Sequence, residues 1–133
     1  MAKLRHIAIS VPDLERSAKF YEETFGLKRV NFAKTPYGDG LSLSDGVVNL
    51  TLLHFHTDDA AGDERGKDFV GIHHMGFVVD DLESVSERIK DNGGTFHREL
   101  TGGGGVDFER KFRDPEGNMF DISDKGWFGA LNE

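Results

Sequence analysis

The residues of this 133-residue chain that could do chemistry are histidines and carboxylates, because the sequence contains no cysteine. Without cysteine there is no disulfide, no thiolate metal ligand and no cysteine nucleophile. Two of the six histidines, His6 and His74, lie 68 residues apart in similar sequence surroundings. Imidazole side chains carry protons or bind divalent metal ions near neutral pH, so this pair is the first candidate for a functional site.

The two histidines belong to an internal repeat. The segments 4–14 and 72–82 both alternate bulky and smaller residues, and both end in an Asp-Leu step. In each segment the histidine stands eight residues before the final leucine. Repetition at a fixed offset indicates an architecture built from two copies of one unit.

Each copy has the pattern of a strand, a helix and three further strands. An apolar helical stripe follows Asp13 and closes at Gly26, and a second one follows Asp81 and closes at Gly93. The later strands are predicted at 27–32, 41–44, 47–55, 95–100, 106–113 and 119–123, with turn residues at 36–40, 45–46 and 114–118. The sequence therefore predicts one domain made of two β-α-β-β-β modules, 4–55 and 72–123. A solvated linker at 57–68 joins the modules, and a tail follows at 124–133.

The expected fold class is α+β, with the two modules forming a cupped mixed sheet and the helices on its outer face. Side chains alternate between the two faces of a strand, and the bulky set of each strand belongs under the helices. The smaller and polar set then lines the cup. Four polar side chains on four strands are expected to converge there: His6, Asn49, His74 and Asp121.

Three of the remaining histidines are expected to lie outside the cup. His73 alternates away from His74 and is expected to be exposed or packed on the other face. His54 and His56 are expected at a solvated strand edge. Glu109 and Lys111 share one face of a strand beside the cup, where they either meet an anionic substrate or lie on a solvated edge.

Two further segments have unusual composition. The glycine-rich run 101–105 precedes a strand and not a helix, so it is predicted to be a flexible loop over the cup and not a phosphate cradle. Trp127 and Phe128 in the tail are expected to dock on their own sheet or on a partner subunit. We expect a two-fold homodimer that buries these aromatic side chains.

The charge balance limits the partners that the chain can bind. Sixteen Lys and Arg residues stand against 24 Asp and Glu, so the formal net charge is −8. Such a chain repels phosphate backbones and anionic lipid, and no apolar run is long enough to span a bilayer. These features predict a cytoplasmic protein with a small-molecule substrate and with neither nucleic acid nor membrane as partner.

The duplicated module order, with a histidine in each first strand and a carboxylate in the final strand, resembles the vicinal oxygen chelate superfamily over roughly residues 4–123. This superfamily includes glyoxalases, extradiol dioxygenases and bleomycin-resistance proteins. The resemblance implies a divalent metal ion (Fe, Mn, Ni, Co or Zn) bound by His6, His74 and Asp121, with Asn49 in a fourth-ligand slot.

The same resemblance implies a metal-dependent lyase, isomerase or dioxygenase that acts on a small substrate with vicinal oxygens. The alternative is a non-catalytic protein that sequesters a small molecule, as bleomycin-resistance proteins do. Asn49 stands where the likeness to glyoxalase I would place a glutamate, and an amide cannot be a general base, which argues against authentic glyoxalase I activity. Glu109 is the candidate base because of its predicted place beside the cup.

Overall fold

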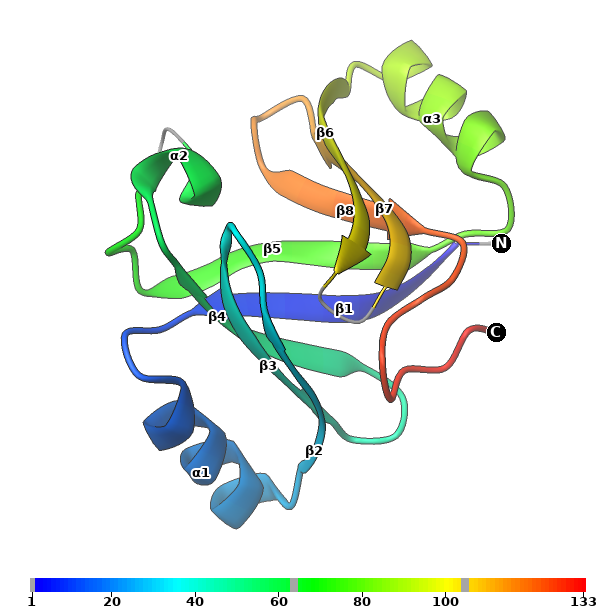
Figure 1. Ribbon diagram of the computed structural model, residues 1–133. Coiled ribbons are helices and arrows are strands. Elements are labelled where there is room, and N and C mark those ends of the chain that lie inside the picture. The colour runs from blue at the N-terminus through cyan, green and yellow to red at the C-terminus, as the bar shows by residue number, and fades with distance from the viewer. Residues whose placement is uncertain (1, 63–64, 104–105) are drawn as a thin grey trace.

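A computed structural model describes residues 2–62, 65–103 and 106–133 (Figure 1). The chain runs through β1 (Lys3–Ser10), α1 (Leu14–Phe25), β2 (Lys28–Lys34), β3 (Gly38–Ser44), β4 (Asn49–Phe55), α2 (Asp58–Ala61), β5 (Gly71–Val78), α3 (Leu82–Asp91), β6 (Thr95–Gly103), β7 (Val106–Arg113) and β8 (Met119–Ser123). None of the helices in this described part is both long and apolar enough to cross a bilayer.

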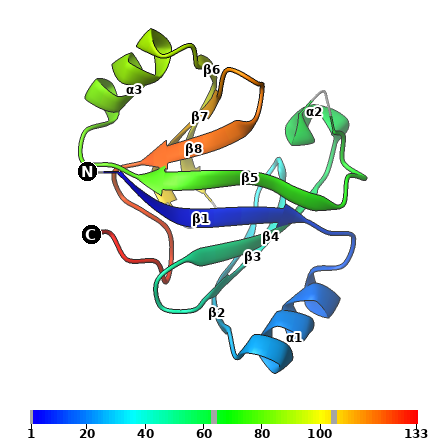
Figure 2. The same cartoon turned by 180° about the vertical axis from the view of Figure 1, so that it is seen from behind.

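The strands of the described residues form one mixed sheet with the order β2-β3-β4-β1-β5-β8-β7-β6. At its centre β1 and β5, the first strands of the two modules, pair in antiparallel fashion. Each of them also pairs in parallel with the last strand of its own module, β4 or β8. Figure 2 shows the central pair from behind, with α1 and α3 on opposite flanks. The predicted α+β fold with two β-α-β-β-β modules is confirmed.

The two long helices begin and end at the residues that the sequence indicates. The Asp13 side chain accepts a hydrogen bond from the Arg16 amide and caps α1, and Asp81 caps α3 in the same way. Gly26 ends α1 in the left-handed conformation at φ 74°, which glycine adopts without a steric penalty.

Each helix covers a separate apolar cluster on the outer face of the sheet. The cluster under α1 is made of Val11, Ala18, Leu41, Leu43 and Leu52, and the cluster under α3 is made of Val79, Phe112 and Ile122. The alternate residues of these strands point into the cup, as the expected period of two requires. The hydrophobic driving force for folding therefore lies outside the cup and leaves its inner face free for polar side chains.

The hairpin between β2 and β3 differs from the expectation of a turn over 36–40. Strand β3 already begins at Gly38, and Thr35 closes a tighter turn by bonding to the Gly38 amide and carbonyl. A Cβ atom at Gly38 would lie 2.6 Å from the His54 carbonyl oxygen. Glycine at position 38 therefore allows two strands to approach closely. The Pro and Gly residues of 36–40 predicted a longer turn because the same residue types are common in turns.

The segment between the modules is not the wholly solvated linker that its composition predicts. It contains the short helix α2, which Thr57 caps through a hydrogen bond to the Ala60 amide. Ala61 at the end of this helix is fully buried. The helix is thus packed against the sheet, and the carbonyl of Ala61 becomes part of the functional site described below.

Candidate metal centre

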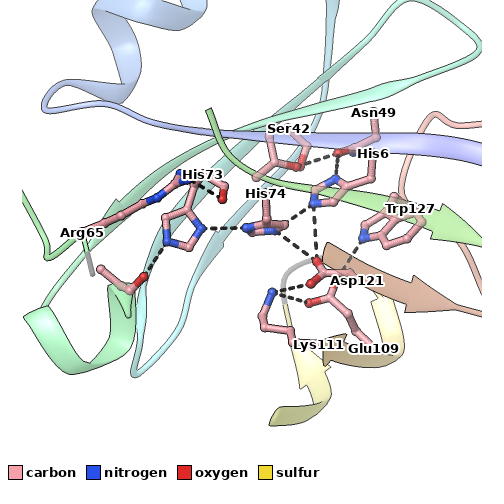
Figure 3. Close-up of polar contacts among 12 residues, drawn as sticks. His6, Ser42, Asn49, Arg65, His73, His74, Glu109, Lys111, Asp121 and Trp127 are labelled. Carbon is pink, nitrogen blue, oxygen red and sulfur yellow. Dashed lines mark hydrogen bonds and ion pairs between the residues drawn. The ribbon is translucent and has the colours of Figure 1, made fainter. Parts of the chain in front are cut away.

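Three side chains from three neighbouring strands meet at the centre of the sheet (Figure 3). The pairing places His6 of β1 and Asp121 of β8 on either side of Gly76 in β5. His74 precedes Gly76 by two residues and so points to the same face. His6, His74 and Asp121 are all buried, with exposures of 4%, 5% and 0%.

The ligand-type atoms of this triad converge on one point. The Nε2 atoms of His6 and His74 are 3.3 Å apart, and Asp121 Oδ2 lies 3.1 Å from His74 Nε2 and 3.9 Å from His6 Nε2. Two ligands that bind a metal at about 2.1 Å, at right-angled to tetrahedral geometry, are roughly 3.0–3.4 Å apart. Two of the three separations fall in or near this range, and the third is somewhat longer.

The proton on His6 is fixed by a chain of hydrogen bonds that ends at a backbone carbonyl. The Asn49 Nδ2 group donates to the Phe128 carbonyl, which can only accept, and this turns Asn49 Oδ1 toward His6 Nδ1 at 2.7 Å. Because Oδ1 is an acceptor, His6 Nδ1 must carry the hydrogen. The Nε2 atom of His6 then presents a lone pair to the centre of the triad.

A second chain fixes His74 in the same way. The His73 Nε2 group donates to the Ala61 carbonyl at 2.5 Å, so the unprotonated His73 Nδ1 accepts from His74 Nδ1 at 2.8 Å. His74 Nε2 therefore also presents a lone pair. The expectation that His73 points away from His74 is wrong, because the register of β1 and β5 shifts between the pairs Ala8–His74 and Ile9–Ile72. His73 is the extra residue of this β-bulge, which breaks the alternation of side chains.

The surroundings keep both imidazoles of the triad neutral. Burial lowers the pKa of His6, although the negative charges of Asp121 and Glu109 oppose this shift. Burial also lowers the pKa of His74 well below its ordinary value, and the positive charge of Lys111 adds to the effect. Both side chains are therefore uncharged at pH 7, with one hydrogen on Nδ1, and are available as neutral metal ligands through Nε2.

These assignments leave three acceptors facing one another. Asp121 Oδ2 accepts no hydrogen bond from any described residue, although it is completely buried. A buried carboxylate oxygen beside two imidazole lone pairs is unfavourable unless a cation lies among them. Two imidazole nitrogens and one carboxylate form a donor set that suits divalent Fe, Mn, Co, Ni or Zn. The residues present thus fit a divalent metal ion.

Lys111 and Glu109 of β7 extend the centre on the side of Asp121. The Lys111 ammonium group lies 2.9 Å from Asp121 Oδ1 and 3.2 Å from Glu109 Oε1. Burial alone would lower the pKa of Lys111, but these two carboxylates raise it above its ordinary value. The strand lies between β6 and β8, so the alternative of a solvated edge for these residues is wrong.

The centre opens into a cavity of about 360 Å³. His6, His74, Glu109, Lys111 and Trp127 line its inner end, and the β2–β3 hairpin with Lys34, Pro36 and Tyr37 lines another part. A cavity of this size holds a small organic molecule. Asp121 contacts the two histidines of the triad but is not among the residues that line the cavity, whereas Glu109 lines it.

The other residues singled out in the sequence have different places. His54 bonds to the Val11 carbonyl, and the exposed His56 contacts Asp39, so neither belongs to the centre. The expectation of a loop over the whole glycine-rich run is wrong for residues 101–103, which belong to β6 and pair with β7, and residues 104 and 105 lie outside the described residues. Trp127 docks on its own sheet and is buried, while the Phe128 side chain is 45% exposed.

A family model described as the Glyoxalase/Bleomycin resistance protein/Dioxygenase superfamily matches residues 3–122. The chain therefore belongs to this superfamily. Solved structures of the same fold include a methylmalonyl-CoA epimerase in complex with methylmalonyl-CoA and NH4+, with a TM-score of 0.75 and 21% identity over 92% of this chain and 93% of that one. A hypothetical protein from Bacillus halodurans C-125 has the same TM-score at 22% identity, over 91% of this chain and 92% of that one.

Curated relatives include enzymes with different activities. A probable trivalent organoarsenical cleaving enzyme of Bacillus subtilis strain 168 is 36% identical over 99 residues, which are 73% of this chain and 60% of that protein. A probable chloroplastic lactoylglutathione lyase of Arabidopsis thaliana is 28% identical over 133 residues, covering 93% of this chain and 36% of that protein. The chain thus spans about three fifths and about one third of the lengths of these two relatives.

The chain of hydrogen bonds through His73 generates the first prediction. His73→Leu removes the acceptor of the His74 Nδ1 hydrogen, and we expect divalent metal affinity to fall by about 10- to 100-fold, as is typical when the partner of a ligating histidine is lost. Isothermal titration with Zn(II) measures this change. His54→Leu is the matched control, because that histidine also bonds to a backbone carbonyl but lies outside the centre. Equal affinities in the two variants would contradict the role assigned to His73.

Proposed function

We propose that the chain is a metal-dependent enzyme that acts on a small substrate with two neighbouring oxygen atoms, with lyase or isomerase chemistry. The observation that carries this proposal is the triad itself. Three buried acceptors converge, their protons are directed elsewhere, and Asp121 Oδ2 accepts no hydrogen bond from any described residue. In the superfamily to which the chain belongs, named relatives include lyases and an epimerase.

His6, His74 and Asp121 would hold the ion, and the cavity would hold the substrate against it. A divalent ion at this position supplies Lewis acidity, which polarises a substrate oxygen and stabilises negative charge that develops there. Asp121 would ligate through Oδ2 alone, because Lys111 occupies Oδ1. Asn49 supports this arrangement from outside the triad, since its oxygen already accepts from His6 and from Thr51.

The charges around the cavity favour an anionic substrate oxygen. Asp121 and Glu109 carry two negative charges and Lys111 one positive charge, which gives a formal total of −1. With a divalent ion the total becomes +1, in a low-dielectric site where such a charge attracts anions strongly. An ammonium group has three donors, and two of those of Lys111 are used by Asp121 and Glu109. The third would donate to a substrate oxygen in the cavity.

Glu109 is the proposed proton acceptor, because it is the carboxylate that lines the cavity without belonging to the triad. Its Oε2 atom accepts from Trp127 Nε1 at 3.0 Å, and its Oε1 atom contacts Lys111. These two contacts hold the carboxylate in one orientation beside the cavity. A substrate that displaces the Lys111 contact would bring a proton within reach of Oε1.

Two more specific activities are disfavoured. Trivalent arsenic binds soft thiolate ligands, and this chain has no cysteine, so it lacks the ligands expected for the activity named for the Bacillus subtilis relative. A lactoylglutathione lyase activity would need a proton-transferring group at the position of Asn49, where the amide cannot act as a base. An Fe(II) dioxygenase is the second candidate, because two histidines and one carboxylate match the facial triad of such enzymes.

Metal binding tests the proposal directly. Chelator-stripped wild-type protein should regain one equivalent of Fe(II), Co(II) or Zn(II), because the triad is a single site of three converging ligands. His74→Ala should bind none of these ions stoichiometrically while remaining folded, since His74 lies outside both apolar clusters. Elemental analysis and circular dichroism measure the two properties, with His54→Ala as control. Equal metal content in wild type and His74→Ala would sink the assignment.

The reaction class is tested with the methylglyoxal–glutathione hemithioacetal. We expect wild-type turnover far below the roughly 10 s⁻¹ of a typical enzyme, because no carboxylate stands at position 49. Asn49→Glu should bind Ni(II) or Zn(II) more tightly, because it adds an anionic oxygen next to His6, and Asn49→Gln is the neutral control of equal length. Wild-type turnover near the typical value would show that another group, such as Glu109, supplies the base.

Oxygen uptake by the Fe(II) form with catechol would support the dioxygenase instead.

A further inference from the structure

The C-terminal segment 127–133 crosses back over the first module and is fixed there mainly through its backbone. We call this segment the strap. Its carbonyls at Phe128 and Gly129 accept hydrogen bonds from Asn49 and Ser44, and its amide at Leu131 donates to the Val47 carbonyl. Arg5 of β1 donates to two further strap carbonyls, those of Leu131 and Glu133. In Figures 1 and 2 the strap lies beside the turn that joins β3 to β4.

Trp127 at the start of the strap contacts the metal centre directly. Its ring is parallel to the ring of His6, with an interplanar angle of 6° and centroids 4.7 Å apart. Its Nε1 group donates to Glu109 Oε2, and the side chain is only 5% exposed. One indole thus covers a ligand of the triad and at the same time holds the carboxylate that lines the cavity (Figure 3).

Gly76 provides the space for this ring. A Cβ atom at position 76 would lie 2.8 Å from two carbons of the Trp127 ring and 3.0 Å from the His6 Cβ atom. Gly76 is also the residue of β5 that separates His6 from Asp121 in the sheet. The sheet is therefore recessed at this point, and the recess is filled by the indole.

We infer that Trp127 is a positioning residue of the metal centre and that the strap carrying it sets the orientation of His6. The inference rests on the proposed metal site. The imidazole of His6 can rotate about its bond to Cβ, and two strap contacts oppose this rotation. Trp127 covers one face of the ring, and the Phe128 carbonyl fixes Asn49, which accepts from the ring nitrogen. Both contacts hold the Nε2 lone pair toward His74 and Asp121.

A thermodynamic consequence follows from this arrangement. If the docked strap increases the affinity for the ion, the bound ion must increase the stability of the docked strap by the same factor. The last three residues of the strap are exposed and therefore accessible to a protease. Metal-loaded protein should therefore resist digestion by carboxypeptidase longer than stripped protein.

Three variants separate positioning from general stability. Trp127→Leu removes the aromatic face and the N–H donor, whereas Trp127→Phe keeps an aromatic face on His6 and loses only the donor to Glu109. Phe112→Leu is the matched control, because Phe112 is a buried aromatic residue in the apolar cluster under α3, where its ring packs against Phe96 and Phe120. Competition between Co(II) and a chelator gives the affinities, and the visible absorption of bound Co(II) reports the ligand geometry.

We expect Trp127→Leu to lower Co(II) affinity by about 10-fold or more, in the range found for groups that orient a metal ligand. The visible absorption of its bound Co(II) should also change. Trp127→Phe should recover most of the affinity, and Phe112→Leu should lose thermal stability without losing affinity. Trp127 is the single tryptophan of the chain, so Co(II) should quench the intrinsic fluorescence of the wild-type protein as it binds.

The outcomes distinguish this inference from the proposed function. Wild-type protein that binds no Co(II) would overturn the metal site itself. Wild-type protein that binds Co(II), together with a folded Trp127→Leu variant of unchanged affinity and absorption, would overturn the role of Trp127 and leave the site intact. If Trp127→Leu does not fold, the carboxypeptidase digestion of metal-loaded and stripped wild-type protein decides, because equal rates would contradict the coupling between the strap and the ion. Binding of Co(II) without any quenching would contradict the contact between Trp127 and a ligand.

Discussion

The centre of this protein depends on keeping protons away from three buried acceptor atoms that face one another. His6 Nε2, His74 Nε2 and Asp121 Oδ2 lie within 3.9 Å of each other, and no described residue donates a hydrogen bond to the carboxylate oxygen. Such an arrangement is unstable in a low-dielectric interior unless a cation joins the three groups. Two chains of hydrogen bonds in the surrounding structure keep the hydrogens of His6 and His74 on Nδ1 and so maintain this arrangement.

The two modules maintain it with different partners, although their histidines occupy equivalent positions. In the first module, Asn49 of β4 is paired with His6 across the sheet. Its amide group donates to the Phe128 carbonyl, and its oxygen therefore accepts from His6. In the second module, the bulged residue His73 donates to the Ala61 carbonyl, and its other ring nitrogen therefore accepts from His74. Both chains end at a backbone carbonyl, which can only accept a hydrogen bond and so fixes every group that precedes it. The carbonyls come from α2 and from the strap, which are the two segments outside the repeated modules.

Much of the fold and the triad could be predicted from the sequence, because both depend on local patterns. The period of two along the strands places His6, His74 and Asp121 on one face, and the Asp-Leu steps locate the two helix starts. The bulge at His73 could not be predicted, because it arises from the pairing of β5 with β1. The alternation of bulky and small residues along the segment does not indicate it. The only signal in the sequence was that His73 stands directly before the candidate ligand His74.

The place of Trp127 also lay beyond sequence reasoning. Its contact with His6 joins residues at opposite ends of the chain, and it depends on the recess that Gly76 leaves in β5. The sequence did suggest that an aromatic tail must dock on something, and the sheet of the same chain is one of the two surfaces expected. The sequence predicted that Glu109 and Lys111 share one face of their strand, because they are two residues apart. The contact of Lys111 with Asp121 also depends on the pairing of β7 with β8.

The central claim is most directly tested by diffraction from crystals soaked in Zn(II) or Co(II), with anomalous data collected at the metal absorption edge. The claim predicts one strong anomalous peak within about 2.3 Å of His6 Nε2, His74 Nε2 and Asp121 Oδ2. The side chain of Asn49 should remain hydrogen-bonded to His6 Nδ1 and should not contact the ion. An anomalous peak elsewhere on the molecule, with the three acceptor atoms unliganded, would contradict it.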